Sequence, residues 1–273
     1  MTESIQGGVI DLSAAQLAVA AALILVAGAV SLALGLRIER RLGLAAVRTV
    51  VQLFLVGYVL RWVFGLDSAW AVGAVALFMV AMAARTAVAR PAHKMHGATW
   101  RAFVSLVVSG SLTTVVVTAL IVRVEPWYQP QYVIPLLGMI LGNGLTGLSL
   151  CLDQLLDRFA ERRDEIEMEL ALGASRWEAA REPLADAVRR GMIPIVNSMM
   201  IVGVVSLPGM MTGQILQGAD PVVAVKYQIM VMFMIAAATS LSSMMIAWMV
   251  YRRMFNANDQ MTDGVIVVKK RRA

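Results

Sequence analysis

Long apolar runs recur along this chain, and they restrict what it can fold into more than any other feature. Each run is near or above the roughly 20 residues that an α-helix needs to cross the hydrocarbon core of a bilayer. Mean hydropathy is +0.72, too high for a soluble domain with a single core. The sequence therefore predicts an all-α, polytopic membrane protein with about seven spanning helices, and residues 1–273 as one transmembrane domain. The predicted spans are 14–36, 49–66, 69–89, 102–122, 132–151, 188–207 and 226–250.

The positions of Lys and Arg orient the predicted spans. Most of them follow the first, third, fifth and seventh spans, whereas the opposite side has little more than Arg123 and Lys226. Because cytoplasmic loops carry the excess of Lys and Arg, the N-terminus is predicted outside and the C-terminus in the cytoplasm. This orientation places residues 152–187, the longest polar segment inside the chain, in the cytoplasm.

Composition excludes several other classes of protein. The net charge of +6 could suggest a nucleic-acid partner, but the charges cluster between apolar runs, so the expected environment is a lipid bilayer and no nucleic acid. The single cysteine, Cys151, excludes a disulfide framework within the chain. No span carries paired carboxylates or a nucleophile motif, so the chain is not expected to be an enzyme. His93 and His96 have no acidic residue or cysteine close by in the sequence, which makes them weak metal ligands.

The cytoplasmic segment has the pattern of two helices joined by a tight turn. Residues 157–172 lack Gly and Pro and are rich in good helix formers. Gly173 can take the left-handed position that ends a helix, and Ser175 with Glu178 forms a capping box that begins the next. Pro183 suits the first turn of a third helix, which would run into the sixth span.

The predicted charged helix has two narrow apolar lines instead of one broad apolar face. Ile166 and Leu170 form one line, and Met168 and Leu172 form the other. A helix lying on a lipid surface would need a wider apolar face, so contact with another protein fits better. The alternative is a well-capped helical hairpin that only links two spans.

Residues 169–175, ELALGAS, resemble the EAA loop of ABC transporter permease subunits. The departure is Glu167-Met168-Glu169, where many permeases have Glu-Ala-Ala. The resemblance implies a coupling helix that docks on a separate ATP-binding cassette ATPase subunit. The residues that it implicates in this coupling are Glu165, Glu169, Leu170, Gly173, Ala174, Ser175 and Trp177.

A second resemblance covers most of residues 40–255. Residues 191–241, which contain SLPGMMTGQIL, and residues 134–145, IPLLGMILGNGL, resemble the FetB-type family of iron-export ABC permeases and the related plant aluminium-tolerance permeases. This implies metal export, with iron as the first expectation, across the inner (plasma) membrane. It also implies a homodimer of permeases with two ATPases.

No G-x-x-x-x-G-K-[ST] phosphate loop occurs in the chain. ATP and Mg are therefore expected on the partner subunit, with no cofactor on this chain. In the fifth span, Gly138-x-x-x-Gly142 favours a close helix contact, for which the subunit interface is one candidate.

Polar residues near the predicted outer side suggest where a substrate could pass. Pro208 and Pro221 bracket a Gly-rich stretch that is either an outer loop or a re-entrant segment. Twelve of the 19 methionines lie in 192–254; they suit packing better than iron binding, and no metal ligand is assigned. The candidate path residues are Gln52, Asn197, Met210, Met211, Gln214, Gln217, Asp220, Tyr227 and Gln228.

An ion-coupled secondary transporter of a small polar solute is the alternative function. Such a transporter needs membrane-embedded ionisable groups for coupling. None of the predicted spans contains Asp or Glu, so the permease interpretation is favoured.

Overall fold

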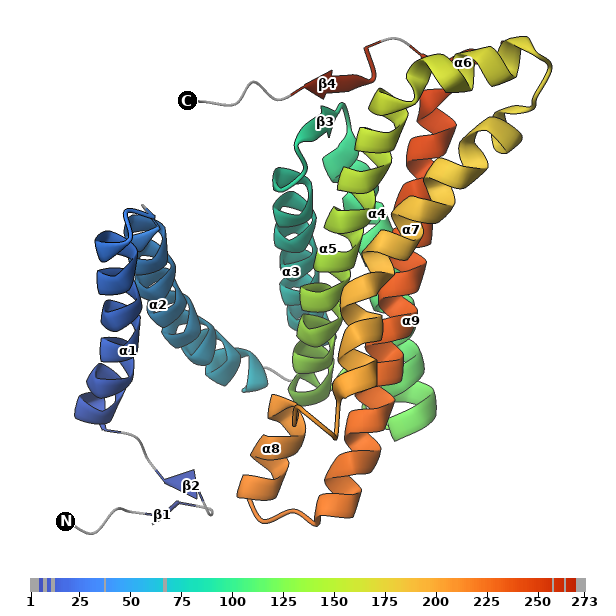
Figure 1. Cartoon of the computed structure of the whole chain (residues 1–273). Coiled ribbons are helices and arrows are strands. Elements are labelled where there is room, and N and C mark those ends of the chain that lie inside the picture. The colour runs from blue at the N-terminus through green and yellow to red at the C-terminus, as the bar shows by residue number, and fades with distance from the viewer. Residues whose placement is uncertain are drawn as a thin grey trace. The chain divides into compact units, whose positions relative to one another are not determined.

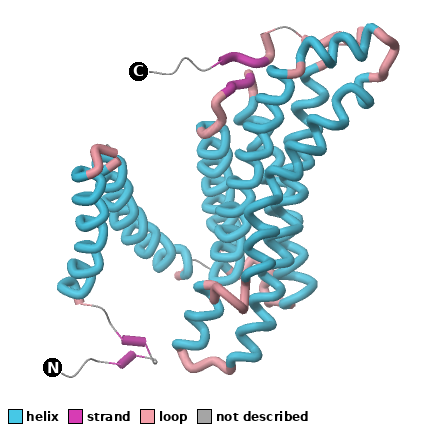
Figure 2. Tube along the Cα trace, in the orientation of Figure 1, coloured by secondary structure: helices cyan, strands magenta, loops and turns pink. Residues whose placement is uncertain are grey.

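A computed structural model describes residues 5–6, 9–10, 13–36, 38–65, 68–256, 258–262 and 264–268. These residues form nine α-helices, one π-helical segment and four short strands (Figures 1 and 2). They divide into two compact units: Met1–Asp67 with Gly209–Ala224, and Ser68–Pro208 with Val225–Ala273. The helical architecture confirms the predicted fold class.

The first unit contains a pair of apolar helices. Strands β1 (Ile5–Gln6) and β2 (Val9–Ile10) pair antiparallel ahead of α1 (Ala14–Ala33) and α2 (Glu39–Phe64). The buried Ser31 holds the connection between the helices, because its hydroxyl donates to Glu39 Oε2 at 2.9 Å and accepts from the Ile38 amide at 3.2 Å. The eight-residue α8 (Gly209–Leu216) also belongs to this unit.

The second unit is a helical bundle built around α5. Its elements are α3 (Ala69–Ala89), β3 (His93–Met95), α4 (Ala98–Val115), the π-helical η1 (Val116–Val122), α5 (Pro130–Glu161), α6 (Arg163–Ala171), α7 (Arg176–Ile201), most of α9 (Pro221–Met254) and β4 (Ile266–Val268). Helix α5 packs against α3, α4 and α7. Strand β4 pairs antiparallel with β3, and both lie at the same end of the unit as α6 (Figure 1).

Small residues let three helices of this bundle meet closely. A Cβ atom on Gly147 would lie 2.8 Å from the Gly191 carbonyl oxygen and 2.5 Å from Thr239 Cγ2. A Cβ atom on Gly191 would lie 2.7 Å from the Gly147 carbonyl oxygen. The close contact of the fifth span therefore lies at Gly147. At Gly142 a Cβ atom would meet nothing within 4 Å, so that position stays open to another chain.

Six helices in the described part of the chain are long and apolar enough to cross a membrane: α1, α2, α3, α4 with η1, α5 and α9. The sixth predicted span, 188–207, falls instead on α7, whose first half is charged. Its predicted end at residue 207 was wrong, because the helix ends at Ile201 and a turn with Gly203 at φ +84° follows. The count of seven spans and the orientation stay predictions.

Candidate functional site

Residues 162–182 form a helical hairpin, here called the coupling hairpin, at the β3–β4 end of the second unit (Figure 1). Its turn is the one predicted. Gly173 has a φ of +96°, its amide donates to the Leu170 carbonyl at 3.1 Å, and the Ala174 amide donates to the Glu169 carbonyl at 3.0 Å. These two bonds close the end of α6 as a Schellman motif.

The predicted capping box begins α7. The Ser175 hydroxyl accepts from the Glu178 amide at 3.3 Å, and Glu178 Oε2 accepts from the Ser175 amide at 2.8 Å and from its hydroxyl at 2.7 Å. The bond from the hydroxyl, followed by the bond from the amide, lowers the pKa of Glu178 from its usual 4.5. The direction of α7 at the turn is thus fixed by residues that lie next to one another in the chain.

The predicted continuous helix over 157–172 was wrong, because the helix is interrupted at Arg162, which has φ −100° and ψ 19°. The Arg162 guanidinium donates to both carboxylate oxygens of Glu165, at 2.7 and 2.6 Å, and to Glu182 of α7 at 2.6 Å. The bonds to Glu165 and then Glu182 raise the pKa of Arg162 above its usual range, and the bond from Arg162 lowers the pKa of Glu165. Arg162 therefore fastens α6 to α7.

The prediction that Pro183 begins a third helix was also wrong. Helix α7 continues from Arg176 to Ile201 with Pro183 and Pro194 inside it. A proline removes one backbone hydrogen bond, which normally ends or kinks a helix. Here Ala180, Pro183 and Ala187 are buried, and α7 packs extensively on α5, so tertiary contacts hold the helix through the proline.

The two predicted apolar lines of α6 face different surroundings. Ile166 is 1% exposed within the bundle core, and Leu170 packs against that core. By contrast, Met168 is 57% exposed, Leu172 is 81% exposed, and Trp177 at the start of α7 is 54% exposed. The hairpin is thus anchored by one apolar line and presents the other outward. Among the other residues implicated in coupling, Glu165, Gly173 and Ser175 are exposed, and Glu169 and Ala174 are half-buried.

The end of α9 and the residues after it hold the hairpin in place, a contribution that sequence reasoning missed. Arg176 forms an ion pair with Asp259, and its Nη1 donates to the Asn256 carbonyl at 3.3 Å. The Trp177 ring meets Tyr251 edge-on, with centroids 6.0 Å apart. The only hint in the sequence was the opposite charge of residues about 80 positions apart, which does not identify a pair.

The end of α5 next to the coupling hairpin holds the loop between α3 and α4. Asp153 Oδ1 accepts from the Ala92 amide at 2.9 Å, and Asp157 Oδ1 lies 2.6 Å from His93 Nδ1. His93 therefore has an acidic neighbour in the folded chain, although none is close to it in the sequence. Still, no group of three His, Cys, Asp or Glu side chains that could hold a metal ion occurs among the described residues.

The Gly-rich stretch between Pro208 and Pro221 contains the helix α8. Gly218, at φ +87°, ends this helix with a second Schellman motif. Asp220 Oδ1 accepts from the amides of Val222 and Val223, at 2.9 and 3.0 Å, and so caps the start of α9. This role accounts for the position of Asp220 without a substrate.

The other candidate path residues differ in exposure. Gln228 is 6% exposed, and neither its Oε1 nor the buried Oε1 of Gln214 has a hydrogen-bond partner in the described structure. Met210, Met211 and Tyr227 are half-buried, whereas Gln52, Asn197 and Gln217 are exposed. Met210, Met211 and Gln214 lie on α8 and Gln217 directly follows it, whereas the others lie on separate helices: Gln52 on α2, Asn197 on α7, and Tyr227 and Gln228 on α9.

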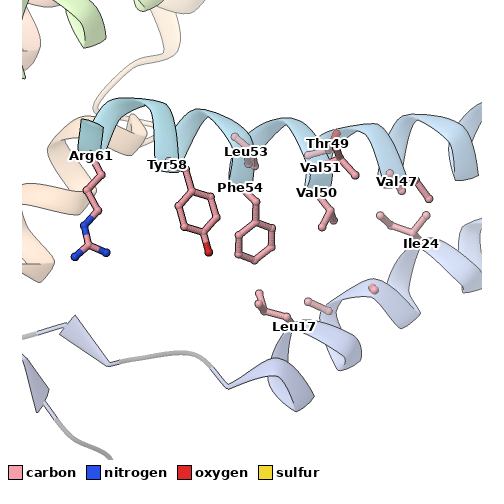
Figure 3. A pocket seen from close by; sticks show the side chains of 14 residues that line it. Leu17, Ile24, Val47, Thr49, Val50, Val51, Leu53, Phe54, Tyr58 and Arg61 are labelled. Atoms are coloured by element: carbon pink, nitrogen blue, oxygen red, sulfur yellow. The ribbon is translucent and has the colours of Figure 1, made fainter. Parts of the chain in front are cut away.

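A groove of about 930 Å³ lies between α1 and α2 (Figure 3). Its lining is apolar apart from Thr49, Tyr58 and Arg61. Gln52 does not line it, although its neighbours Val51 and Leu53 do. This groove therefore gives Gln52 no role in a substrate path.

Comparison with known proteins gives one consistent family. The model of the uncharacterised protein family UPF0014 matches residues 14–255. A UPF0014 membrane protein of Synechocystis is 40% identical over 83% of this chain and 88% of its own length. The Escherichia coli protein named "Probable iron export permease protein FetB" is 36% identical over 90% of this chain and 93% of its own. Protein ALUMINUM SENSITIVE 3 of Arabidopsis thaliana is 32% identical over 91% and 89%. No solved structure matches the chain.

Proposed function

Since this chain belongs to the UPF0014 family of multi-pass membrane proteins, we propose that it is the permease subunit of an ABC-type metal exporter driven by a separate ATPase. The observation that carries the proposal is the coupling hairpin. It is held by the contacts of Arg162, Ser175 and Arg176, and it leaves the apolar side chains Met168, Leu172 and Trp177 exposed. A water-facing surface of this kind is unfavourable unless a partner covers it.

The construction of the hairpin suits the transmission of movement. Arg162 ties α6 to α7, and Arg176 ties α7 to the residues after α9. The 32 residues of α5 and the 26 of α7 form helices about 48 and 39 Å long, and both enter the bundle directly from the hairpin. A displacement of the hairpin by ATP binding on the partner would therefore move α5 and α7 as rigid bodies.

The cargo and the composition of the complex follow from the relatives. We take iron as the first cargo to test because the name of the relative FetB refers to iron export. ATP and Mg would bind to the partner, since this sequence contains no Walker-type phosphate loop. Two permease subunits would join two ATPases, because a two-fold dimer is the commonest closed assembly.

The docking surface is tested by a single exposed side chain. Leu172→Asp should weaken co-purification of the ATPase roughly 10- to 100-fold, because burial of a leucine side chain contributes about 1.5–3 kcal/mol. Trp127→Asp is the control, since Trp127 is an apolar side chain that is 52% exposed in the loop between η1 and α5, outside the predicted spans. Equal ATPase recovery with both variants would place the docking surface elsewhere.

The cargo is tested separately in proteoliposomes that contain the permease and its ATPase. We expect Fe²⁺ to stimulate ATP hydrolysis and to be transported, with Leu172→Asp abolishing both. Stimulation by a nucleotide sugar and not by Fe²⁺ would overturn the iron assignment. Solute movement driven by an ion gradient without ATP would instead support the secondary-transporter alternative.

A further inference from the structure

An apolar groove of about 450 Å³ runs between α7 and α9 in the second unit. Trp177, Arg181 and Trp248 contribute its polar and aromatic lining. The remaining lining residues are Leu184, Ala185, Val188, Met244 and Ala247. The groove is therefore apolar along most of its length, with tryptophan and arginine toward the start of α7 and the end of α9.

A second hollow, of about 370 Å³, adjoins this groove through the shared Trp248. It is lined by Arg176, Trp248, Tyr251, Arg252 and Phe255. The apolar groove thus continues into a basic, aromatic mouth. Predicted orientation places this mouth on the cytoplasmic side of the bilayer.

One arginine of the groove, Arg181, and one of the mouth, Arg252, are available for an anion. Arg252 lies over the Trp248 ring, with its guanidinium carbon 5.0 Å from the ring centroid. In the described part of the chain, no acidic side chain forms an ion pair with Arg181 or Arg252. The carboxylates nearest to Arg181 along α7 are occupied, Glu178 by the Ser175 cap and Glu182 by Arg162.

From these features we propose that the groove binds an anionic phospholipid of the cytoplasmic leaflet. One acyl chain would lie along Leu184, Val188 and Met244, and the headgroup phosphate would bind Arg181 and Arg252. Basic pockets between membrane helices recognise anionic headgroups, and tryptophan favours the boundary between headgroups and hydrocarbon. Charge complementarity and the continuity of the two hollows select this ligand.

The position of the groove connects this lipid to the coupling hairpin. Trp177 lines the groove and also belongs to the exposed face of the hairpin. A bound lipid would therefore restrict the first turn of α7 without needing the ATPase. The inference depends on membrane location and orientation, and it stands even if the partner is not an ATPase.

Lipid titration of the purified protein, followed by native mass spectrometry, tests the headgroup site. Phosphatidylglycerol should bind roughly tenfold more tightly than phosphatidylcholine with the same acyl chains. The double variant Arg181→Gln/Arg252→Gln should lose this preference. The control Arg189→Gln/Arg190→Gln removes the same charge from α7 at positions that do not line either hollow, and it should keep the preference.

The apolar half is tested by filling the groove. Ala185→Phe should reduce binding of both lipids several-fold while the protein stays monodisperse. Equal binding of the two lipids by the wild type, or equal behaviour of the two double variants, would overturn the proposal. A third outcome would also overturn it: the Arg181→Gln/Arg252→Gln variant no longer binds the ATPase, or no longer self-associates, but still binds phosphatidylglycerol. The mouth would then be a contact with another protein.

Discussion

Gly173 illustrates how much one residue contributes to the coupling hairpin. A Cβ atom added there would meet nothing within 4 Å, but the φ of +96° is unfavourable for any L side chain. Gly173→Ala should therefore cost roughly 1–2 kcal/mol of local stability through backbone strain alone. We expect amide hydrogen exchange across residues 164–180 to accelerate about tenfold or more, as measured by mass spectrometry.

Gly43→Ala provides the control for this substitution. Gly43 also has open space around its Cβ position, but it lies inside α2, where alanine is favourable. Unchanged exchange across 164–180 in Gly173→Ala would show that the turn does not hold the hairpin.

Acid should loosen the same hairpin. The pKa values of Glu178 and Glu165 lie below the usual 4.5 in the folded protein, so their ionised forms stabilise it above that pH. The stabilisation is lost as the pH falls below 4.5 and through the lowered values. A spin label on Leu172→Cys should become more mobile in this window, as measured by electron paramagnetic resonance.

The double variant Glu165→Gln/Glu178→Gln should remove this pH dependence, since neither glutamine titrates. A label whose mobility still changes below pH 4.5 in the double variant would assign the effect to other carboxylates.

Sequence reasoning located the residues of the hairpin whose partners are close in the chain. Gly173 and the Ser175–Glu178 box were found because turns and caps are decided by a few consecutive residues. The Arg162–Glu182 and Arg176–Asp259 pairs were not found, because a charge in a sequence does not specify a distant partner.

At the scale of elements, the crossing of α5 and α7 is the most restrictive contact in the bundle. An added methyl group on Gly147 would meet the backbone of Gly191, which cannot rotate away as a side chain can. Gly147→Ala should therefore destabilise the protein by about 1–3 kcal/mol. We expect a lower Tm in detergent, by roughly 3–10 °C, followed by tryptophan fluorescence.

Gly73→Ala, in α3 of the same unit, should leave Tm nearly unchanged, because nothing lies within 4 Å of its Cβ position. An equal decrease in both variants would show that the close contact at Gly147 is not responsible, because alanine has the higher helix propensity at both positions.

The helix boundary predicted at Pro183 was wrong because tertiary contacts outweigh local propensity there. Pro183 and the charges of α7 indicate separate short helices when local propensity is considered alone. Burial of Ala180 and Ala187 against the bundle outweighs that propensity and extends α7 through the proline. Local patterns therefore predicted that helices exist here, and tertiary packing decided where they end.

At the scale of the molecule, the open face of α5 at Gly142 is our candidate for the contact between two permease subunits. Gly142→Cys should form a disulfide-linked dimer in oxidised membranes, since a disulfide needs Cβ atoms only about 3.5–4.5 Å apart. Ser242→Cys should not form one, because Ser242 is completely buried in the described structure, as is the native Cys151. Dimers are measured by non-reducing electrophoresis.

If Gly142→Cys and the neighbouring Asn143→Cys both remain monomeric, the subunit contact lies on another face. Both positions are exposed on α5, so a dimer built on this face should bring one of them within reach.

The fold class was predictable because six apolar helices exceed the length that a bilayer requires. The number of spans was not, because α7 combines a charged half with a short apolar half. Such a helix can be classified only with knowledge of what surrounds it.

The ion pair between Arg176 and Asp259 has a consequence for the order of assembly. Translation makes α6 and α7 before it makes α9 and the residues beyond it, including Phe255 and Met261, which are buried in the same core. The hairpin therefore reaches its final packing only after synthesis has passed Met261. A partner that recognises the packed hairpin would bind finished chains and ignore nascent ones.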